Sequence, residues 1–137
     1  MSEEPIEIVE HTADWSLRVR GEDLEMLFKN AALGMAMLMV EDLEALPPDI
    51  ERDIQLEAYD AESLLVDWLG ELAYWAESEG LVFHDFDIRE IDNGRLAATV
   101  RGGKAPVLDK HIKAVTFHNL AITAVDSGLE VTIVFDV

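Results

Sequence analysis

The sequence of 137 residues contains no cysteine, which excludes disulfides, zinc–thiolate centres and cysteine nucleophiles. Basic residues are also scarce: 10 lysines and arginines face 29 aspartates and glutamates, for a formal net charge of -19. Binding to a phosphate backbone needs clustered Lys and Arg, so we expect no direct contact with nucleic acid. The simplest explanation of the charge is solubility or a salt-rich cytoplasm. A positively charged partner or ion is the sharper alternative.

Long apolar runs are absent as well. The longest, 31–40, is too short for a bilayer, which needs about 20 residues. The first five residues, MSEEP, are acidic and lack the apolar core of a signal peptide. Half of all residues are nevertheless apolar, enough for a core in one domain, 1–137. We therefore expect a cytoplasmic protein without a membrane span.

Apolar periodicity predicts two helices and several strands. One helix follows Asp23 as N-cap, and a second follows Asp60 and stops at Gly80. Alternating patterns predict strands at 6–8, 15–20, 50–59, 81–91, 95–101, 113–125 and 129–136, with a loop at 102–106. The Asp92-Asn93-Gly94 turn favours a tight hairpin because Asn-Gly tolerates positive φ. The expected fold is α+β, with two helices packed on a largely antiparallel sheet.

Two acidic motifs stand at opposite ends of the chain: EHTAD at 10–14 and the final Phe135-Asp136-Val137. In the last strand Asp136 alternates with the apolar face and should point away from the core. If the fold brings Asp14 to Asp136 and the Val137 carboxylate, three hard oxygen groups converge. That set suits Ca²⁺ or Mg²⁺. Alternatively, Asp14 only shapes a turn and Asp136 is a surface charge.

Other candidates are less specific. No pair of histidines has a tight zinc-binding spacing among His11, His84, His111 and His118. A zinc site from His11, His111 and His118 is geometrically possible, but the sequence does not support it. Lys113 opens a strand in a lysine-poor chain and either balances acidic groups or contacts a phosphate or carboxylate of a partner. The chain shows no phosphate-binding glycine loop and no nucleophile elbow.

Several of these segments together resemble the archease family. The matching segments are EHTAD at 10–14, the LExLFxxAAxGM pattern at 24–35, LLVxWLxEL at 64–72, IKAVTFH at 112–118 and FDV at 135–137. Three features depart from the family pattern. Trp15 stands where a small aliphatic residue is usual, Phe117 stands where tyrosine is common, and the segment 106–112 is shorter than in many members.

The resemblance implies an accessory protein of an RtcB-type RNA-splicing ligase. Such a ligase joins a 3′-phosphate or 2′,3′-cyclic phosphate end to a 5′-hydroxyl with GTP and a divalent metal such as Mn²⁺, through a guanylylated histidine. The family protein promotes guanylylation and multiple turnover and is not itself an enzyme. By resemblance, Asp14, Asp136 and Val137 form the metal site and Lys113 is functional. His11 and His118 belong to the same motifs and complete the expected partner surface.

Two other functions remain open at this stage. A small metal-dependent hydrolase would use the same carboxylates, although the sequence offers no base-plus-nucleophile arrangement. A general chaperone or binding protein would use the Met-rich and aromatic helix faces, which core packing explains better. The sequence does not specify an oligomeric state.

Overall fold

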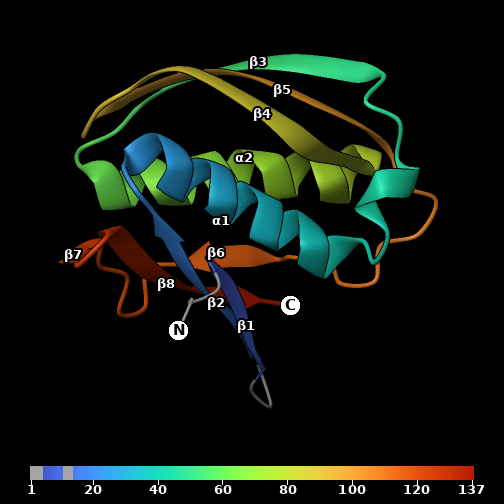
Figure 1. The fold of residues 1–137 in the computed structure, drawn as a ribbon. Coiled ribbons are helices and arrows are strands. Elements are labelled where there is room, and N and C mark those ends of the chain that lie inside the picture. Colours follow the sequence, from blue (N-terminus) through green and yellow to red (C-terminus); the bar gives the residue numbers. More distant parts are fainter. Residues whose placement is uncertain (1–4, 11–13) are drawn as a thin grey trace.

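The computed structural model describes residues 5–10 and 14–137. It has three layers, in which two helices lie between two antiparallel sheets (Figure 1). The helices are α1 (Leu24–Met39) and α2 (Ala61–Glu79), with a short 3₁₀ turn at Leu43–Ala45. The predicted α+β class with two helices and antiparallel strands is confirmed. None of the helices in the described ranges is both long and apolar enough to cross a membrane.

The first sheet contains both ends of the chain. Its strands are β1 (Ile6–Glu10), β2 (Asp14–Gly21), β8 (Gly128–Asp136) and β6 (Ala114–Thr116), in that order, and β7 (Thr123–Val125) also pairs with β8. The second sheet has the order β3 (Ile50–Glu57), β5 (Arg95–Lys104) and β4 (Leu81–Ile91). The sequence pattern predicted the strands but not their division into two sheets.

The helix boundaries follow from local chemistry. The Asp23 side chain accepts a 2.9 Å hydrogen bond from the Met26 amide, and the Asp60 side chain accepts a 2.8 Å bond from the Ser63 amide. Both bonds satisfy amides that the first helical turn leaves unpaired. Gly80 ends α2 in the left-handed region, with φ of 70°. All three predicted helix signals are confirmed.

The position of α1 between the two sheets explains its many small residues. A Cβ atom added at Gly34 would lie 3.0 Å from side-chain atoms of Ile6 and Leu17. Glycine therefore lets the helix approach β1 and β2 closely. Two of the four methionines of α1, Met35 and Met39, are buried in the core, and the other two, Met26 and Met37, are exposed. Close layers above and below the helices make one continuous core.

Aromatic side chains of α2 join the helices to the second sheet. Trp68 is fully buried, donates a 3.0 Å hydrogen bond to the Phe28 carbonyl oxygen of α1, and meets Phe86 edge to face at 5.9 Å between ring centroids. The ring centroids of Trp75 and Phe83 are 5.3 Å apart. A buried indole needs a partner for its N–H group, and the Phe28 carbonyl supplies it.

Two turn predictions were wrong in detail. The segment 102–104, expected as a loop, continues β5, because a Cβ at Gly102 would lie 2.1 Å from the Val82 carbonyl oxygen and glycine permits this close strand pairing. The 92–94 hairpin is present, yet neither Asn93 nor Gly94 has a positive φ. The Asp92 side chain instead accepts hydrogen bonds of 2.8 Å from two amides of the turn.

The strand expected at 113–125 is two strands. β6 and β7 pair with different parts of β8, and the residues between them, 117–122, leave the sheet. Asn119 in this connection has a φ of 53°, a left-handed conformation that asparagine tolerates. The Ile122 amide donates a 3.0 Å hydrogen bond to Glu62 of α2, which holds the connection against the helix. β7 and β8 form a hairpin in which Val125 pairs with Gly128.

Candidate functional site

Strand β8 places the two acidic motifs side by side. In the antiparallel register, Asp136 of β8 has Asp14 of β2 as its Cα partner on one side and Ala114 of β6 on the other. Residues directly opposite in such a pair have Cα atoms about 4.5–5.5 Å apart. The side chain of Asp14 lies outside the described part of the structure. The backbone register alone brings these distant residues together.

Asp136 lies off the core face, as the alternation predicted. Phe135 and Ile133 on the opposite parity are fully buried, whereas Asp136 is exposed. The Asp136 carbonyl oxygen accepts a 2.7 Å hydrogen bond from the Lys113 amide. The backbone of Asp136 is thereby fixed, and its carboxylate faces solvent, where an ion has access.

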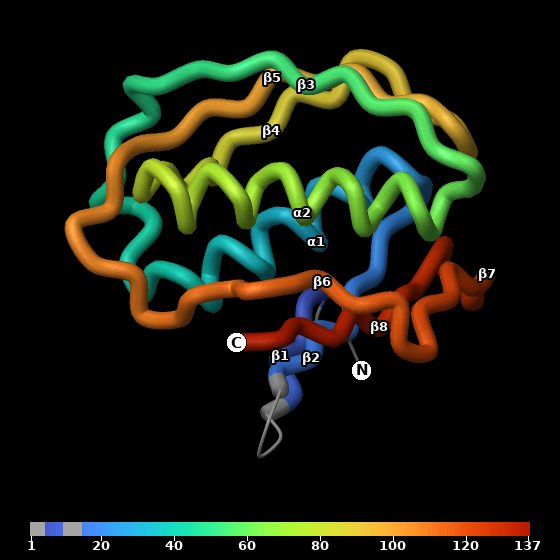
Figure 2. The backbone as a smooth tube through the Cα atoms, turned by 180° about the vertical axis from the view of Figure 1, so that it is seen from behind, coloured from blue at the N-terminus to red at the C-terminus, as the bar shows by residue number. Residues whose placement is uncertain are grey.

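Val137 is held by packing. Its side chain is partly buried against the hydrophobic core, whereas Asp136 is exposed. This packing anchors Val137, the residue next to Asp136, at the end of the tube marked C in Figure 2. Carboxylate oxygens are hard ligands of the kind that Ca²⁺ and Mg²⁺ prefer. The donor types at this end of the sheet fit such an ion.

Lys113 joins this group, and the histidines are placed differently. Lys113 is exposed and directly precedes β6, beside Asp136. His118 lies four residues beyond Ala114, in the connection that leaves the sheet. Its amide donates to the Thr116 hydroxyl at 3.3 Å, and its Nε2 lies 3.3 Å from the Asn119 side-chain nitrogen. His11 falls outside the described residues.

No zinc site emerges from the described histidines. Nδ1 of His111 lies 3.0 Å from Glu77 of α2, so it pairs with a carboxylate, whereas His118 belongs to the 117–122 connection. Within the described side chains, no three His, Asp or Glu residues gather as a metal-binding group. The Asp14 side chain and His11 are not among those side chains.

Sequence reasoning missed one neighbour of the site. The ammonium nitrogen of Lys110 lies 3.9 Å from the centroid of the Trp15 ring, the residue after Asp14. The two are far apart in sequence, and no spacing rule links them. The departure from the family pattern at Trp15 was the one available signal.

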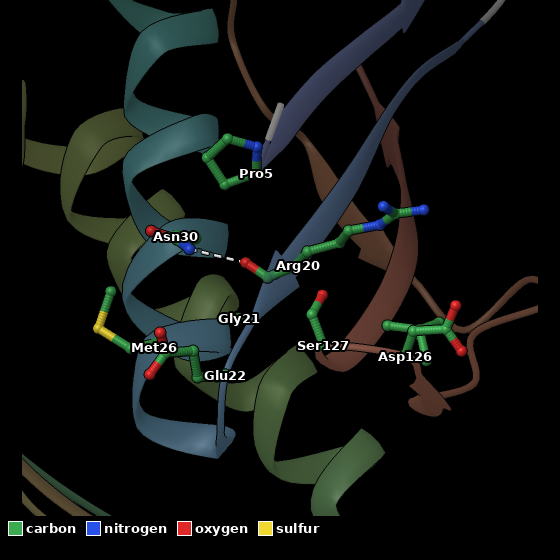
Figure 3. A pocket seen from close by; sticks show the side chains of 9 residues that line it. Pro5, Arg20, Gly21, Glu22, Met26, Asn30, Asp126 and Ser127 are labelled. Atoms are coloured by element: carbon green, nitrogen blue, oxygen red, sulfur yellow. Dashed lines mark hydrogen bonds between the residues drawn. The ribbon is translucent and has the colours of Figure 1, made fainter. Parts of the chain in front are cut away.

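An open hollow of about 820 Å³ lies at the other end of β2 (Figure 3). Gly21, at the end of β2, and the 125–127 turn line it, as do Met26 and Asn30 of α1. The Asn30 side chain donates a 2.7 Å hydrogen bond to the Arg20 carbonyl oxygen at its wall. Seven residues of extended strand, about 23 Å, separate Gly21 from Asp14. The hollow is therefore distinct from the candidate metal site.

Comparisons with known proteins agree on one family. Residues 6–137 match the model of the Archease protein family (MTH1598/TM1083). Protein archease of Methanosarcina barkeri is 36% identical over 139 residues, covering 96% of this chain and 94% of the relative. The solution structure of Methanobacterium thermoautotrophicum protein 1598 is 32% identical with a TM-score of 0.79, covering 97% of this chain and 99% of that one. A Thermotoga maritima archease, described as a possible chaperone, has a TM-score of 0.66 at 24% identity, covering 100% and 98%.

Proposed function

The chain belongs to the archease family, and on this premise we propose that it activates an RtcB-type RNA-splicing ligase. In this proposal it promotes guanylylation of the ligase and multiple turnover, and it catalyses no ligation itself. It acts in the cytoplasm, contacts the ligase rather than RNA, and carries a divalent cation, Ca²⁺ or Mg²⁺, at the end of its first sheet.

One observation carries the proposal: β8 lies between the strand with Asp14 and the segment with Lys113. The family resemblance marks Asp14, Lys113, Asp136 and Val137 as functional; the first lies near the start of the sequence and the other three lie in its last quarter. Their meeting at one sheet end supports a shared site. A purely structural role for Asp136 would not require its exposure beside an exposed lysine.

The residues of this end would each have a separate task. Asp14, Asp136 and the Val137 carboxylate would hold the cation, which supplies concentrated positive charge on an otherwise acidic surface. The Lys113 amide holds the backbone of Asp136 and leaves the ammonium group free to meet a carboxylate or phosphate of the partner. Packing of Val137 against the core keeps the last residue in place.

The charge of the whole chain fits a basic partner. A net charge of -19 on a protein of 15.3 kDa produces a long-range attraction to a cleft rich in Lys and Arg. Such steering raises the association rate and is weakened by salt. The same charge disfavours RNA as the direct partner.

The alternative functions have weaker support. A general chaperone needs an exposed apolar surface, whereas Met35 and Met39 of the Met-rich run are buried. A hydrolase would be expected to place its carboxylates in a cleft. The open hollow of about 820 Å³ instead lies at the far end of β2 from Asp14.

Single-turnover guanylylation of the cognate ligase tests the proposal. The ligase is incubated with GTP and a divalent metal, with and without this protein, and the covalent guanylate is measured over time. We expect faster guanylylation with the protein, and more sealed product per ligase when RNA is added. Equal guanylylation rates in the two conditions would refute the proposal.

A further inference from the structure

The segment that leads to Lys113 is attached residue by residue to different parts of the fold. The Asp109 amide donates a 2.7 Å hydrogen bond to the Met39 carbonyl oxygen at the end of α1. Ile112 is buried in the core, with 3% of its surface exposed. Residues 109–113 are called the anchored segment below. It is the last part of the connection from β5 to β6, which Figure 2 shows passing the helix layer.

The other residues of the anchored segment make the remaining contacts. His111 meets Glu77 of α2, and the Lys113 amide bonds to Asp136 of β8. Lys110 reaches β2, where its ammonium nitrogen lies 3.9 Å from the Trp15 ring centroid. This distance is well within the range of a cation–π interaction. Of these contacts, the one at Lys110 is made with the strand that carries Asp14.

The partner of Lys110 is unusual for this chain. With 29 acidic residues available, the expected partner of a cation is a carboxylate. Lys29 follows that expectation by pairing with Glu25, and every arginine does the same. The six paired arginines are Arg18, Arg20, Arg52, Arg89, Arg95 and Arg101. Lys110 is placed over an aromatic ring instead.

The position of Trp15 links this contact to the candidate site. Trp15 follows Asp14 in β2, and its Cα partner in β8 is Phe135, the residue before Asp136. The anchored segment therefore holds β2 through Lys110 and β8 through the Lys113 amide. These are the two strands whose register sets the Asp14–Asp136 pair.

We propose that Lys110 and Trp15 are a positioning pair, which holds the anchored segment against β2 and so keeps Lys113 in place beside Asp136. Neither residue touches the partner or the ion in this role. The inference deepens the proposed ligase activation and rests on it for the functional effect. The mechanical part, that Lys110 holds the Lys113 amide on β8, stands on the contacts alone.

Hydrogen exchange of the Lys113 amide tests the mechanical part directly, because this amide is bound only while the segment is docked on β8. The variants are Lys110→Met, which keeps the chain length without the charge, Lys110→Arg, which keeps a cation for the ring, and Trp15→Leu. Loss of an exposed cation–π contact corresponds to about a two- to five-fold lower protection. Lys104→Met, the same charge loss at the end of β5, is the matched control.

We expect Lys110→Met and Trp15→Leu each to lower both the exchange protection of the Lys113 amide and ligase stimulation. The double variant should show the same protection and stimulation as the more affected of the two single variants. Lys110→Arg should restore both readouts, and Lys104→Met should change neither. Unchanged Lys113 protection in Lys110→Met overturns the proposal. So does reduced protection with full stimulation, because positioning is then irrelevant to function. If the wild-type protein stimulates no ligase, the proposed function fails, while the exchange data still decide whether Lys110 holds the segment.

Discussion

The backbone amide of Lys113 donates a 2.7 Å hydrogen bond to the carbonyl oxygen of Asp136. This bond extends the β6–β8 pairing by one residue beyond Ala114. It uses only main-chain atoms, so the position of Lys113 does not depend on its side chain. The exposed ammonium group is therefore available for a contact outside the molecule.

Replacing Lys113 by alanine should separate function from stability. We expect Lys113→Ala to fold normally, with a stability change within about 0.5 kcal/mol, because an exposed side chain away from the core contributes little. Stimulation of ligase guanylylation should fall strongly, while Lys104→Ala, an exposed lysine at the end of β5, should retain it. Thermal melts and single-turnover guanylylation measure the two effects. A large drop in melting temperature with full stimulation by the folded fraction would mark Lys113 as structural.

The paired aspartates should be required for ion binding. We expect Asp14→Asn and Asp136→Asn each to weaken Ca²⁺ binding by at least about 10-fold, since losing even an outer-shell partner costs about 10- to 100-fold. Asp126→Asn, in the β7–β8 turn at the other end of the sheet, removes the same charge and should bind normally. Isothermal titration calorimetry with Ca²⁺ and Mg²⁺ is the measurement. Equal affinities in all three variants would show that the ion, if bound, lies elsewhere.

Sequence reasoning succeeded where the signal was local. Asp23 and Asp60 each bond an amide three residues ahead, and the alternation along 129–136 placed Asp136 opposite the buried Phe135. It failed where a residue type serves two purposes. Gly102 was taken as loop-forming, but it allows close approach of a neighbouring strand. Likewise, periodicity marks a buried helix face without revealing that a sheet covers each side of α1.

The candidate site depended on contacts between distant segments. No spacing rule predicts that Asp14 and Asp136 share a register, because strand pairing is set by the whole sheet. Family resemblance pointed to these residues, and the fold brings their backbones together. Neither spacing nor the family pattern predicted the Lys110–Trp15 contact, and the departure from that pattern at Trp15 was the only signal for it.

The terminal carboxylate should contribute to ion binding. In a protein that ends at Val137, adding two alanines converts this carboxylate into a peptide carbonyl and removes one negative charge from the proposed ligand set. We expect weaker Ca²⁺ affinity, because affinity depends on the number of charged ligands. The same two residues added before Met1 serve as the control. Unchanged affinity of the C-terminally extended protein in calorimetry would eliminate the role of the terminus.

The N-cap of α2 should give a defined pH dependence. Hydrogen bonds from Ser63, first its amide and then its side chain, hold the pKa of Asp60 below its ordinary value of 3.8. A lowered folded-state pKa stabilises the protein above the unfolded pKa, and this stabilisation is lost as pH falls through the folded value. Asp60→Asn should therefore lower the melting temperature at pH 7, and the difference from wild type should shrink below about pH 4. A difference that stays constant down to pH 2 would contradict this assignment.

The protein alone should neither bind guanylate covalently nor seal RNA. Radiolabelled GTP and RNA halves incubated with it should yield no adduct and no product, since it lacks a phosphate-cradling loop and its charge repels RNA. Adding catalytic amounts to the ligase should raise the rate. That gain should decline as salt rises from about 0.1 M to about 1 M, where the screening length falls from about 10 to about 3 Å. The unstimulated ligase rate at each salt concentration is the control. A guanylate adduct on the protein itself, absent in Asp14→Asn and Asp136→Asn, would show that the protein is an enzyme and not an activator.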